Sequence, residues 1–201
     1  MITDISQLDP NGTYTYADYL KWQFDESVEL LKGKLFKMSP APRAKHQRVH
    51  SRLLIDIGAF LRANPCEIYS APFDVRLPNP DYDGGPYEPG FNDKVHTVVQ
   101  PDICVICDES KVDEFGCVGP PDWIIEIASP STQKKDFNEK FDLYEAAGVP
   151  EYWIAIPKSQ EIYVFALEDG HYEQKAVYEQ GQTAASVRYP ALTMSLDWIF
   201  G

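Results

Sequence analysis

The stretch Asp122–Ser131, DWIIEIASPS, places one acidic residue inside an apolar run. Residues 123–127 are aromatic or β-branched except for Glu126, and such a run is typical of a strand buried on both faces of a sheet. An ionised carboxylate is almost never fully buried unless it is paired or bound to a cation, because it loses its hydration. The stretch therefore predicts a central strand in which Glu126 faces a cation.

Strand patterns recur on both sides of this stretch. Strands are expected at Glu67–Leu77, Val95–Cys107, Asp122–Ala128, Glu151–Ile156 and Glu161–Ala166. Two shorter strands are expected on either side of a turn at Lys32–Gly33, and the C-terminal part is expected to form a hairpin and a closing helical turn. These strands predict a sheet with Asp122–Ala128 near its centre.

Helical patterns alternate with the strands. Apolar residues recur at helical spacing in one long segment, at Val49, Leu53, Leu54, Ile57 and Leu61. A short helix is expected after Thr15, with Asp18 completing its cap, and another between ASPST and Gly148. The alternation predicts an α/β fold in which helices cover the sheet. The segment Pro78–Lys94 has no apolar period and is expected to be a solvated or disordered loop, or one that contacts substrate or a second subunit.

Composition limits the classes of protein to which the chain can belong. Its 201 residues, 44% hydrophobic and 13% aromatic, suit one globular domain over residues 1–201. No apolar run is long enough for a membrane span and the N-terminus is polar, so a soluble cytoplasmic protein with no membrane partner is expected. The net charge of −13 means that any binding of nucleic acid must rely on weak contacts, a small basic patch or metal ions.

The chain has four cysteines, and two of them form a CxxC pair, Cys104 and Cys107. Residues three apart on a strand point to opposite faces, and no second CxxC or nearby histidine completes a zinc site. Structural cysteines are therefore expected in preference to a metal or redox pair.

A second acid lies in an apolar strand at Asp102, in HTVVQPDICVI. Pro101 removes a ladder hydrogen bond and predicts a distortion there that redirects the next side chain. Two acids from adjacent strands can bind one hard cation, which prefers oxygen ligands, so Glu126 is expected to face a metal ion. Asp122 is a weaker candidate, because on a regular strand it lies ~13 Å from Glu126.

The helix that follows the central strand carries a lysine among apolar residues. Placing residues about 100° apart gathers Phe137, Phe141, Leu143, Tyr144 and Ala147 around Lys140. Lys134 and Lys135 fall on the opposite, polar side. A lone lysine on an apolar face often extends its ammonium to solvent. Two misplaced acids nearby favour the alternative, in which Lys140 meets the carboxylates and a scissile phosphate.

Two histidines, His46 and His50, lie on the inward side of the long helix. His46 is expected to be either a core-edge histidine or a site residue that contacts phosphate or an acid of the site. The pair has the i, i+4 spacing of zinc ligands, but no third ligand is evident.

Three segments resemble the Uma family of restriction endonucleases in the PD-(D/E)XK nuclease superfamily. They are VVQPDICVI, PDWIIEIASPSTQKKDFNEKFDLYEAAGVPEYW and VELLKGKLFKMSPAP, and the likeness covers nearly the whole chain. The resemblance implies a restriction-endonuclease-like central mixed sheet flanked by helices. It also implies that Asp102 is the acid of the PD motif and that Glu126 opens the (D/E)XK triplet. Ala128 stands at the usual lysine position, so the resemblance places the lysine at Lys140 and adds Glu29 as a further acid.

The resemblance further implies a metal-dependent phosphodiester hydrolase, a DNA endonuclease that uses Mg²⁺ or Mn²⁺. Asp102 and Glu126 would bind the metal, with the carbonyl of Ile127 as an extra ligand, and His46 and Tyr144 are candidates for contact with substrate. Nucleases with this fold often pair their active sites, so a homodimer or higher homo-oligomer is expected. The alternatives are a catalytically silent scaffold, favoured by the acidic charge and Ala128, and a hydrolase of small phosphoesters.

Overall fold

The computed structural model describes residues 1–38, 43–79 and 88–201 of the chain. One six-stranded sheet has the order β12-β11-β10-β9-β6-β3. Its strands are β3 (Glu67–Ser70), β6 (Ile103–Ile106), β9 (Trp123–Ile127), β10 (Glu151–Ile156), β11 (Glu161–Glu168) and β12 (His171–Tyr178). Only the β9–β10 pair is parallel, so the sheet is mixed, as expected.

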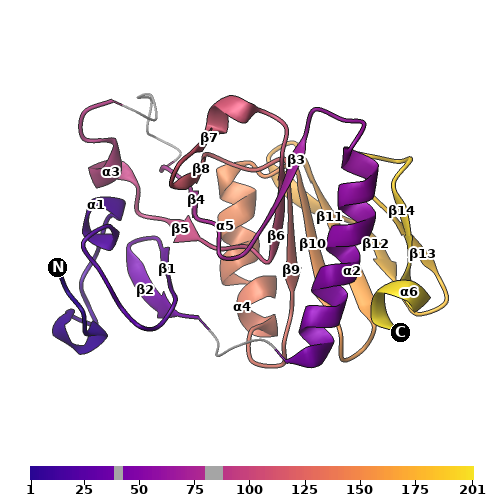
Figure 1. Ribbon diagram of the computed structural model, residues 1–201, viewed down its shortest axis with the longest axis horizontal. Helices are drawn as coiled ribbons and strands as arrows, with labels where there is room; N and C mark the ends of the chain where they lie inside the picture. Colours follow the sequence, from indigo (N-terminus) through magenta and orange to yellow (C-terminus); the bar gives the residue numbers. More distant parts are fainter. Residues whose placement is uncertain (39–42, 80–87) are drawn as a thin grey trace.

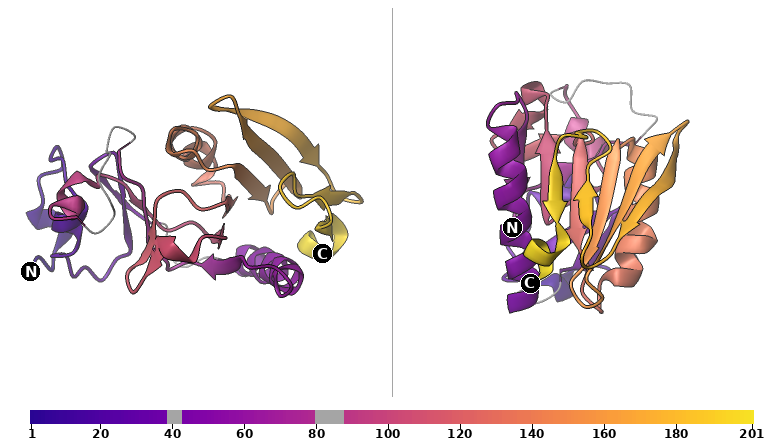
Figure 2. Two further views of the ribbon diagram at one scale, coloured as in Figure 1. Left: turned by 90° about the horizontal axis from the view of Figure 1, so that it is seen from above. Right: turned by 90° about the vertical axis from the view of Figure 1, so that its right-hand side faces the viewer.

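Helices cover both faces of this sheet (Figure 1; Figure 2, left). On one face lie α2 (Ala44–Leu61) and α6 (Leu196–Phe200), and on the other lie α4 (Gln133–Phe137) and α5 (Glu139–Ala147). Strand β9 alternates between the two apolar cores, since Ile125 packs with the α2 residues and Ile124 with the α5 residues. Glu126 is therefore on the face that α5 covers.

A second six-stranded sheet has the order β2-β1-β5-β4-β8-β7. Its strands are β1 (Val28–Leu31), β2 (Lys34–Lys37), β4 (Val75–Arg76), β5 (Val98–Val99), β7 (Val112–Asp113) and β8 (Gly116–Val118). The remaining elements are α1 (Tyr16–Tyr19), α3 (Phe91–Lys94), the hairpin of β13 (Thr183–Ala185) and β14 (Thr193–Ser195), and short 3-10 turns at Ile5–Gln7 and Glu109–Lys111. The termini lie at opposite ends of the long axis (Figure 1).

Two segments expected to be single strands each run from one sheet into the other. The segment Glu67–Leu77 forms β3 and β4, and Val95–Cys107 forms β5 and β6. Pro72 and Pro101 lie in the breaks, where their missing N–H groups interrupt the ladder. The expectation of a distortion at Pro101 is confirmed, and Asp102 lies at the seam between the sheets.

The local turn and cap signals are confirmed. Lys32 and Gly33 have φ values of 48° and 78° in the turn between β1 and β2, and Gly148 ends α5 with φ 81°. Thr15 and Asp18 form a capping box at α1. The expected continuous helix before Gly148 is wrong, because Asn138 (φ −125°, ψ −82°) separates α4 from α5.

The loop expected at Pro78–Lys94 contains α3, and its residues 80–87 lie outside the described residues. Among the helices that the structure describes, none is long and apolar enough to cross a membrane. Cys66 and Cys107 form a disulfide across the end of the β3–β6 pair, whereas Cys104 and Cys117 are buried free thiols. The pairing of Cys66 with Cys107 was not anticipated from the CxxC spacing.

Candidate active site

Glu126 is paired with a lysine of α5. Its Oε1 accepts hydrogen bonds from Lys140 Nζ and from the Tyr144 hydroxyl, each at 2.7 Å. All three side chains are buried, with Tyr144 fully enclosed. Lys140 and Tyr144 are four residues apart on α5 and therefore lie on one face of the helix. The carboxylate in the apolar strand is thus compensated by two donors from the covering helix.

Lys140 also joins the two sheets. Its Nζ lies 2.9 Å from Oε1 of Glu29, a buried residue of β1 in the second sheet. The other oxygen of Glu29 pairs with Lys135 of α4 at 2.5 Å, and the N–H of Gln100 donates to Oε1 at 3.2 Å. Burial alone would raise the pKa of Glu29, but the charges of Lys140 and Lys135 outweigh it and lower that pKa to about 2. Glu29 is therefore the ionised partner of both cations.

Asp102 lies at the seam and is held from two sides. Its Oδ2 accepts the backbone N–H of Ile127 at 2.7 Å and lies 3.3 Å from Nε2 of His46. The backbone carbonyl of Asp102 lies 3.1 Å from Nε2 of His50. His46 therefore belongs to the site through Asp102, and the two histidines contact separate atoms of that residue.

The cluster contains more negative than positive groups. Glu29, Asp102, Glu126 and Asp136 contribute four carboxyl groups, against the ammonium groups of Lys135 and Lys140. Burial raises the pKa of Glu126 to about 8; Lys140 opposes this shift, and the charges of Asp102, Asp136 and Glu29 add to it. Burial likewise raises the pKa of Asp136 to about 6. Glu126 therefore retains a proton near neutral pH unless another cation enters the cluster.

The donor set fits a hard divalent cation. Among the described residues, no group of three or more histidine, cysteine or acidic side chains is arranged to hold a metal ion. Asp102 and Glu126 nevertheless each have a carboxylate oxygen that accepts no hydrogen bond from the described residues. Mg²⁺ is commonly held by only one or two carboxylates together with waters and substrate phosphate oxygens. The charge excess and these free oxygens match that pattern.

Sequence patterns placed Lys135 on the wrong side of the helix and gave no indication of Asp136. Lys135 was assigned to the polar side of a continuous helix, whereas the break at Asn138 turns it toward Glu29. Asp136 is buried at 3% exposure, four residues before Lys140. The four-residue spacing gives no signal here, because the helix break at Asn138 lies between Asp136 and Lys140. Asp122 lies apart from the cluster, since it pairs with Arg188 and accepts the N–H of Cys107.

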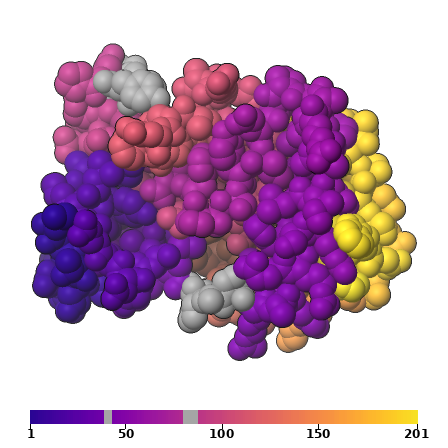
Figure 3. All heavy atoms as spheres, viewed as in Figure 1, coloured from indigo at the N-terminus to yellow at the C-terminus, as the bar shows by residue number. Residues whose placement is uncertain are grey.

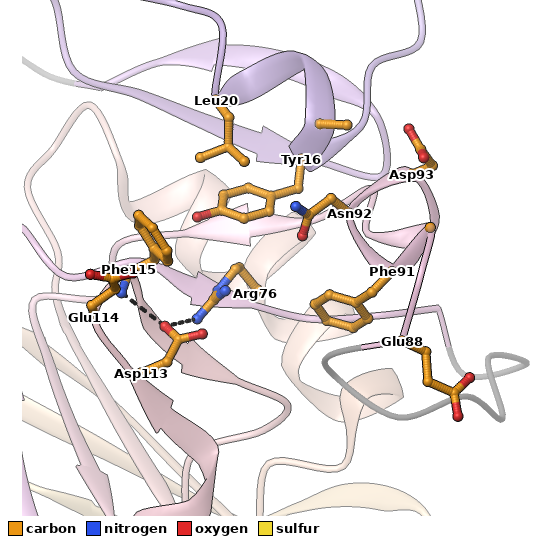
Figure 4. A pocket seen from close by; sticks show the side chains of 12 residues that line it. Tyr16, Leu20, Arg76, Glu88, Phe91, Asn92, Asp93, Asp113, Glu114 and Phe115 are labelled. Atoms are coloured by element: carbon orange, nitrogen blue, oxygen red, sulfur yellow. Dashed lines mark hydrogen bonds and ion pairs between the residues drawn. The ribbon is translucent and has the colours of Figure 1, made fainter.

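A separate cavity lies in the second sheet (Figure 4). It has a volume of about 550 Å³, and Arg76, Tyr16, Phe91 and Phe115 are among its lining residues. Arg76 is buried there and pairs with Asp113 at 2.5 Å, so its charge is already satisfied. None of the acids or lysines of the candidate active site is among the described residues that line this cavity.

Comparisons with known proteins place these features in a family. A family model described as "Uma2: Putative restriction endonuclease" matches residues 16–197. The crystal structure of "a putative nuclease belonging to DUF820" from Anabaena variabilis ATCC 29413 has a TM-score of 0.69 to this chain at 19% sequence identity, covering 93% of this chain and 97% of that chain. No curated protein matches the sequence. The structural likeness confirms the expected α/β nuclease fold, and the family match confirms the resemblance noted in the sequence.

Proposed function

The chain belongs to the Uma2 restriction endonuclease family, and from this premise we propose that it is a metal-dependent phosphodiester hydrolase that cuts DNA as an endonuclease. The observation that carries the proposal is the group at the seam of two sheets, formed by the buried residues Glu29, Glu126 and Lys140 and the half-buried Asp102. Buried charges with raised or lowered pKa values gather at functional sites more often than elsewhere. We also propose that residues 1–201 form a single nuclease domain.

In this proposal, Asp102 and Glu126 hold Mg²⁺ or Mn²⁺, with the carbonyl of Ile127 as a further oxygen ligand. When bound, the ion supplies a Lewis acid that lowers the pKa of water and offsets negative charge on the phosphate. His46 and the Ile127 N–H fix the orientation of the Asp102 carboxylate, as partners of metal-binding groups commonly do.

Lys140 has a different task in the same proposal. An ammonium has three N–H donors, and carboxylate oxygens of Glu29 and Glu126 take two of them. The third donor orients the attacking water or stabilises the charge that develops on the phosphate. Water attacks phosphorus and loses a proton to solvent, the P–O bond to the leaving sugar oxygen breaks, and that oxygen takes up a proton, which leaves a phosphomonoester and a free hydroxyl. Tyr144 keeps Glu126 in position and, with His46, is proposed to lie close to the substrate.

The second candidate function is a catalytically silent scaffold of the same fold. Two observations favour it: Ala128 occupies the usual lysine position, and Lys140 is enclosed between two carboxylates with 5% of its side chain exposed. The net charge of −13 also disfavours an extended contact with nucleic acid. For either function we propose a cytoplasmic location.

A cleavage panel tests the proposed function. Wild type and Asp102→Asn are incubated with single- and double-stranded DNA and RNA in Mg²⁺, Mn²⁺ or EDTA. The proposal expects cleavage by wild type with a metal ion, none in EDTA, and at least a hundred-fold loss in the folded Asp102→Asn variant. Cleavage that survives EDTA or the substitution contradicts the proposed site. A folded wild type that cuts no substrate contradicts the nuclease and favours the scaffold.

A further inference from the structure

An exposed aromatic ring lies beside the buried acids of the site. Phe36 of β2 is the direct cross-strand partner of Glu29 in β1, so their side chains lie on the same face of the second sheet. Glu29 is 2% exposed and Phe36 is 36% exposed. The side chain of a buried acid of the site therefore lies next to an aromatic side chain that is exposed to solvent.

Lys135 bridges these two side chains. Its Nζ pairs with Glu29 Oε2 at 2.5 Å and lies 5.0 Å from the centroid of the Phe36 ring. Its side chain is 22% exposed, against 5% for Lys140. Of the two lysines that bind Glu29, Lys135 is the more exposed to solvent. Figure 3 shows the N-terminal segment, in indigo, and α2, in purple, on opposite sides of this face of the molecule.

Lys135 lies over one face of the Phe36 ring, and the ammonium and the ring together match the two parts of a nucleotide. The ammonium pairs with a phosphate oxygen, and the ring stacks on the base. The bases of a duplex are stacked on one another and offer no free face, so such a pair selects a nucleotide that is unpaired. Stacking also supplies affinity that does not depend on positive charge, which suits a chain with a net charge of −13.

We propose that Phe36 and Lys135 form a subsite for one unpaired nucleotide at the mouth of the active site, with the base on Phe36 and its phosphate on Lys135. This inference rests on the proposed nuclease function and specifies its substrate as single-stranded or locally unpaired nucleic acid. Phosphate binding draws Lys135 toward the substrate, and Lys140 remains as the second partner of Glu29.

A cycle of protein and oligonucleotide changes tests the subsite. Binding of a labelled single-stranded DNA is measured by fluorescence anisotropy in EDTA, for wild type and Phe36→Ala, with oligonucleotides that carry one abasic position moved along the strand. Loss of one stacked base costs on the order of ten-fold in affinity. At one position of the strand, removing the base should weaken binding by wild type about ten-fold. Phe36→Ala should bind the intact strand about ten-fold more weakly than wild type does, and removing the same base should weaken its binding no further.

Two variants complete the design. Trp198 is 45% exposed, and Arg52 lies 4.6 Å from its ring centroid, so Trp198→Ala removes a similar cation–aromatic pair elsewhere and should leave affinity unchanged. Phe36→Tyr should bind with the affinity of wild type, because tyrosine retains the aromatic ring. Lys135→Gln should lower the slope of log affinity against log salt concentration by about 0.7, the value for one single-strand phosphate contact.

The outcomes separate this inference from the function on which it rests. If wild type cleaves in the panel but Phe36→Ala binds single strands as wild type does, the subsite is wrong and the nuclease stands. If wild type binds and cuts only duplexes, the subsite is again wrong. If wild type binds single strands through Phe36 yet cleaves nothing, the subsite stands and catalysis is wrong.

Discussion

Lys140 binds two carboxylates that come from different sheets. It lies 2.7 Å from Glu126 of β9 and 2.9 Å from Glu29 of β1. Removing one member of a buried ion pair leaves an uncompensated charge and typically costs about 3–5 kcal/mol. The same side chain is therefore important for stability and, in the proposed function, for hydrolysis.

Lys140→Ala is expected to abolish hydrolysis and to lower the free energy of unfolding by about 3–5 kcal/mol. Metal should still bind, because Asp102 and Glu126 remain. Ala128 packs in the core on the α5 face, about 7 Å along the strand from Glu126. Adding Ala128→Lys should restore part of the activity, since it supplies a cation at the usual position. Circular dichroism establishes that each variant is folded, and undiminished cleavage by Lys140→Ala would shift the role to Lys135.

The pH dependence of stability depends on Glu126. Burial raises its pKa from the ordinary 4.5 to about 8. A carboxyl group with a higher pKa in the folded state favours folding while it is protonated, so this contribution is complete below pH 4.5 and is lost as the pH rises toward 8. In EDTA, wild type should lose more stability between pH 5 and pH 8 than Glu126→Gln, measured by urea unfolding. Parallel profiles for the two proteins would show that Glu126 does not titrate in this range.

The sequence identified Glu126, Asp102 and Lys140 because each breaks an apolar pattern at its own position. Lys135 and Asp136 break no such pattern, since a polar residue on the solvent side of a helix is ordinary. Their burial depends on where α4 turns relative to α5, which is set by the backbone at Asn138. That turn depends on packing between elements and not on the local sequence.

Among the elements, the β1–β2 hairpin has the most direct effect on the site. Its turn at Lys32–Gly33 sets the register that pairs Glu29 with Phe36. Gly33 has φ +78°, and a Cβ placed there would lie 2.5 Å from Thr13 Cγ2. The hairpin therefore requires glycine for its backbone angle and for the close approach of the N-terminal segment.

Gly33→Ala is expected to lower stability by more than Gly170→Ala does. Gly170 has φ +83°, close to that of Gly33, but no described atom within 4 Å of an added Cβ. Both variants pay about 1–2 kcal/mol for a left-handed alanine, and only Gly33→Ala adds the contact with Thr13. Urea unfolding measures the difference. Equal losses in the two variants would show that the Thr13 contact relaxes freely.

Strands β6, β9 and β10 could be predicted because each is a short apolar run, whereas β12 is mostly polar and gave no such signal. Strand β10 begins and ends at the residues expected for it. The sequence could not show that the expected strands Glu67–Leu77 and Val95–Cys107 each divide between two sheets. A proline indicates where a strand breaks, but not which strands the two parts pair with. Strands β7 and β8, with two and three residues, are too short to give a periodic signal.

At the scale of the whole molecule, apolar side chains remain exposed around the cavity of the second sheet. Leu20 is 50% exposed and Phe115 is 56% exposed, and both line that cavity. Exposed apolar residues that cluster at a concave surface are common at protein interfaces. The expected homodimer or higher homo-oligomer would cover them.

Light scattering at micromolar concentration is expected to give the mass of a dimer or a larger assembly. The Leu20→Ser/Phe115→Ser double variant should shift that mass toward the monomer, because it removes apolar area from the proposed contact. A wild-type protein that is monomeric under these conditions would contradict the expected assembly. A variant that keeps the wild-type mass would place the interface elsewhere.

The central claim is that the acids at the seam of the two sheets form a divalent metal site. Titration calorimetry with Mn²⁺, at pH 6 and pH 8, tests it most directly, with wild type compared with Asp102→Ala/Glu126→Ala. The account predicts one site in wild type that binds more tightly at pH 8, because Glu126 must lose a proton whose pKa is about 8. It predicts no binding by the folded double variant. Absence of Mn²⁺ binding by wild type, or binding that survives the double substitution, would contradict the claim.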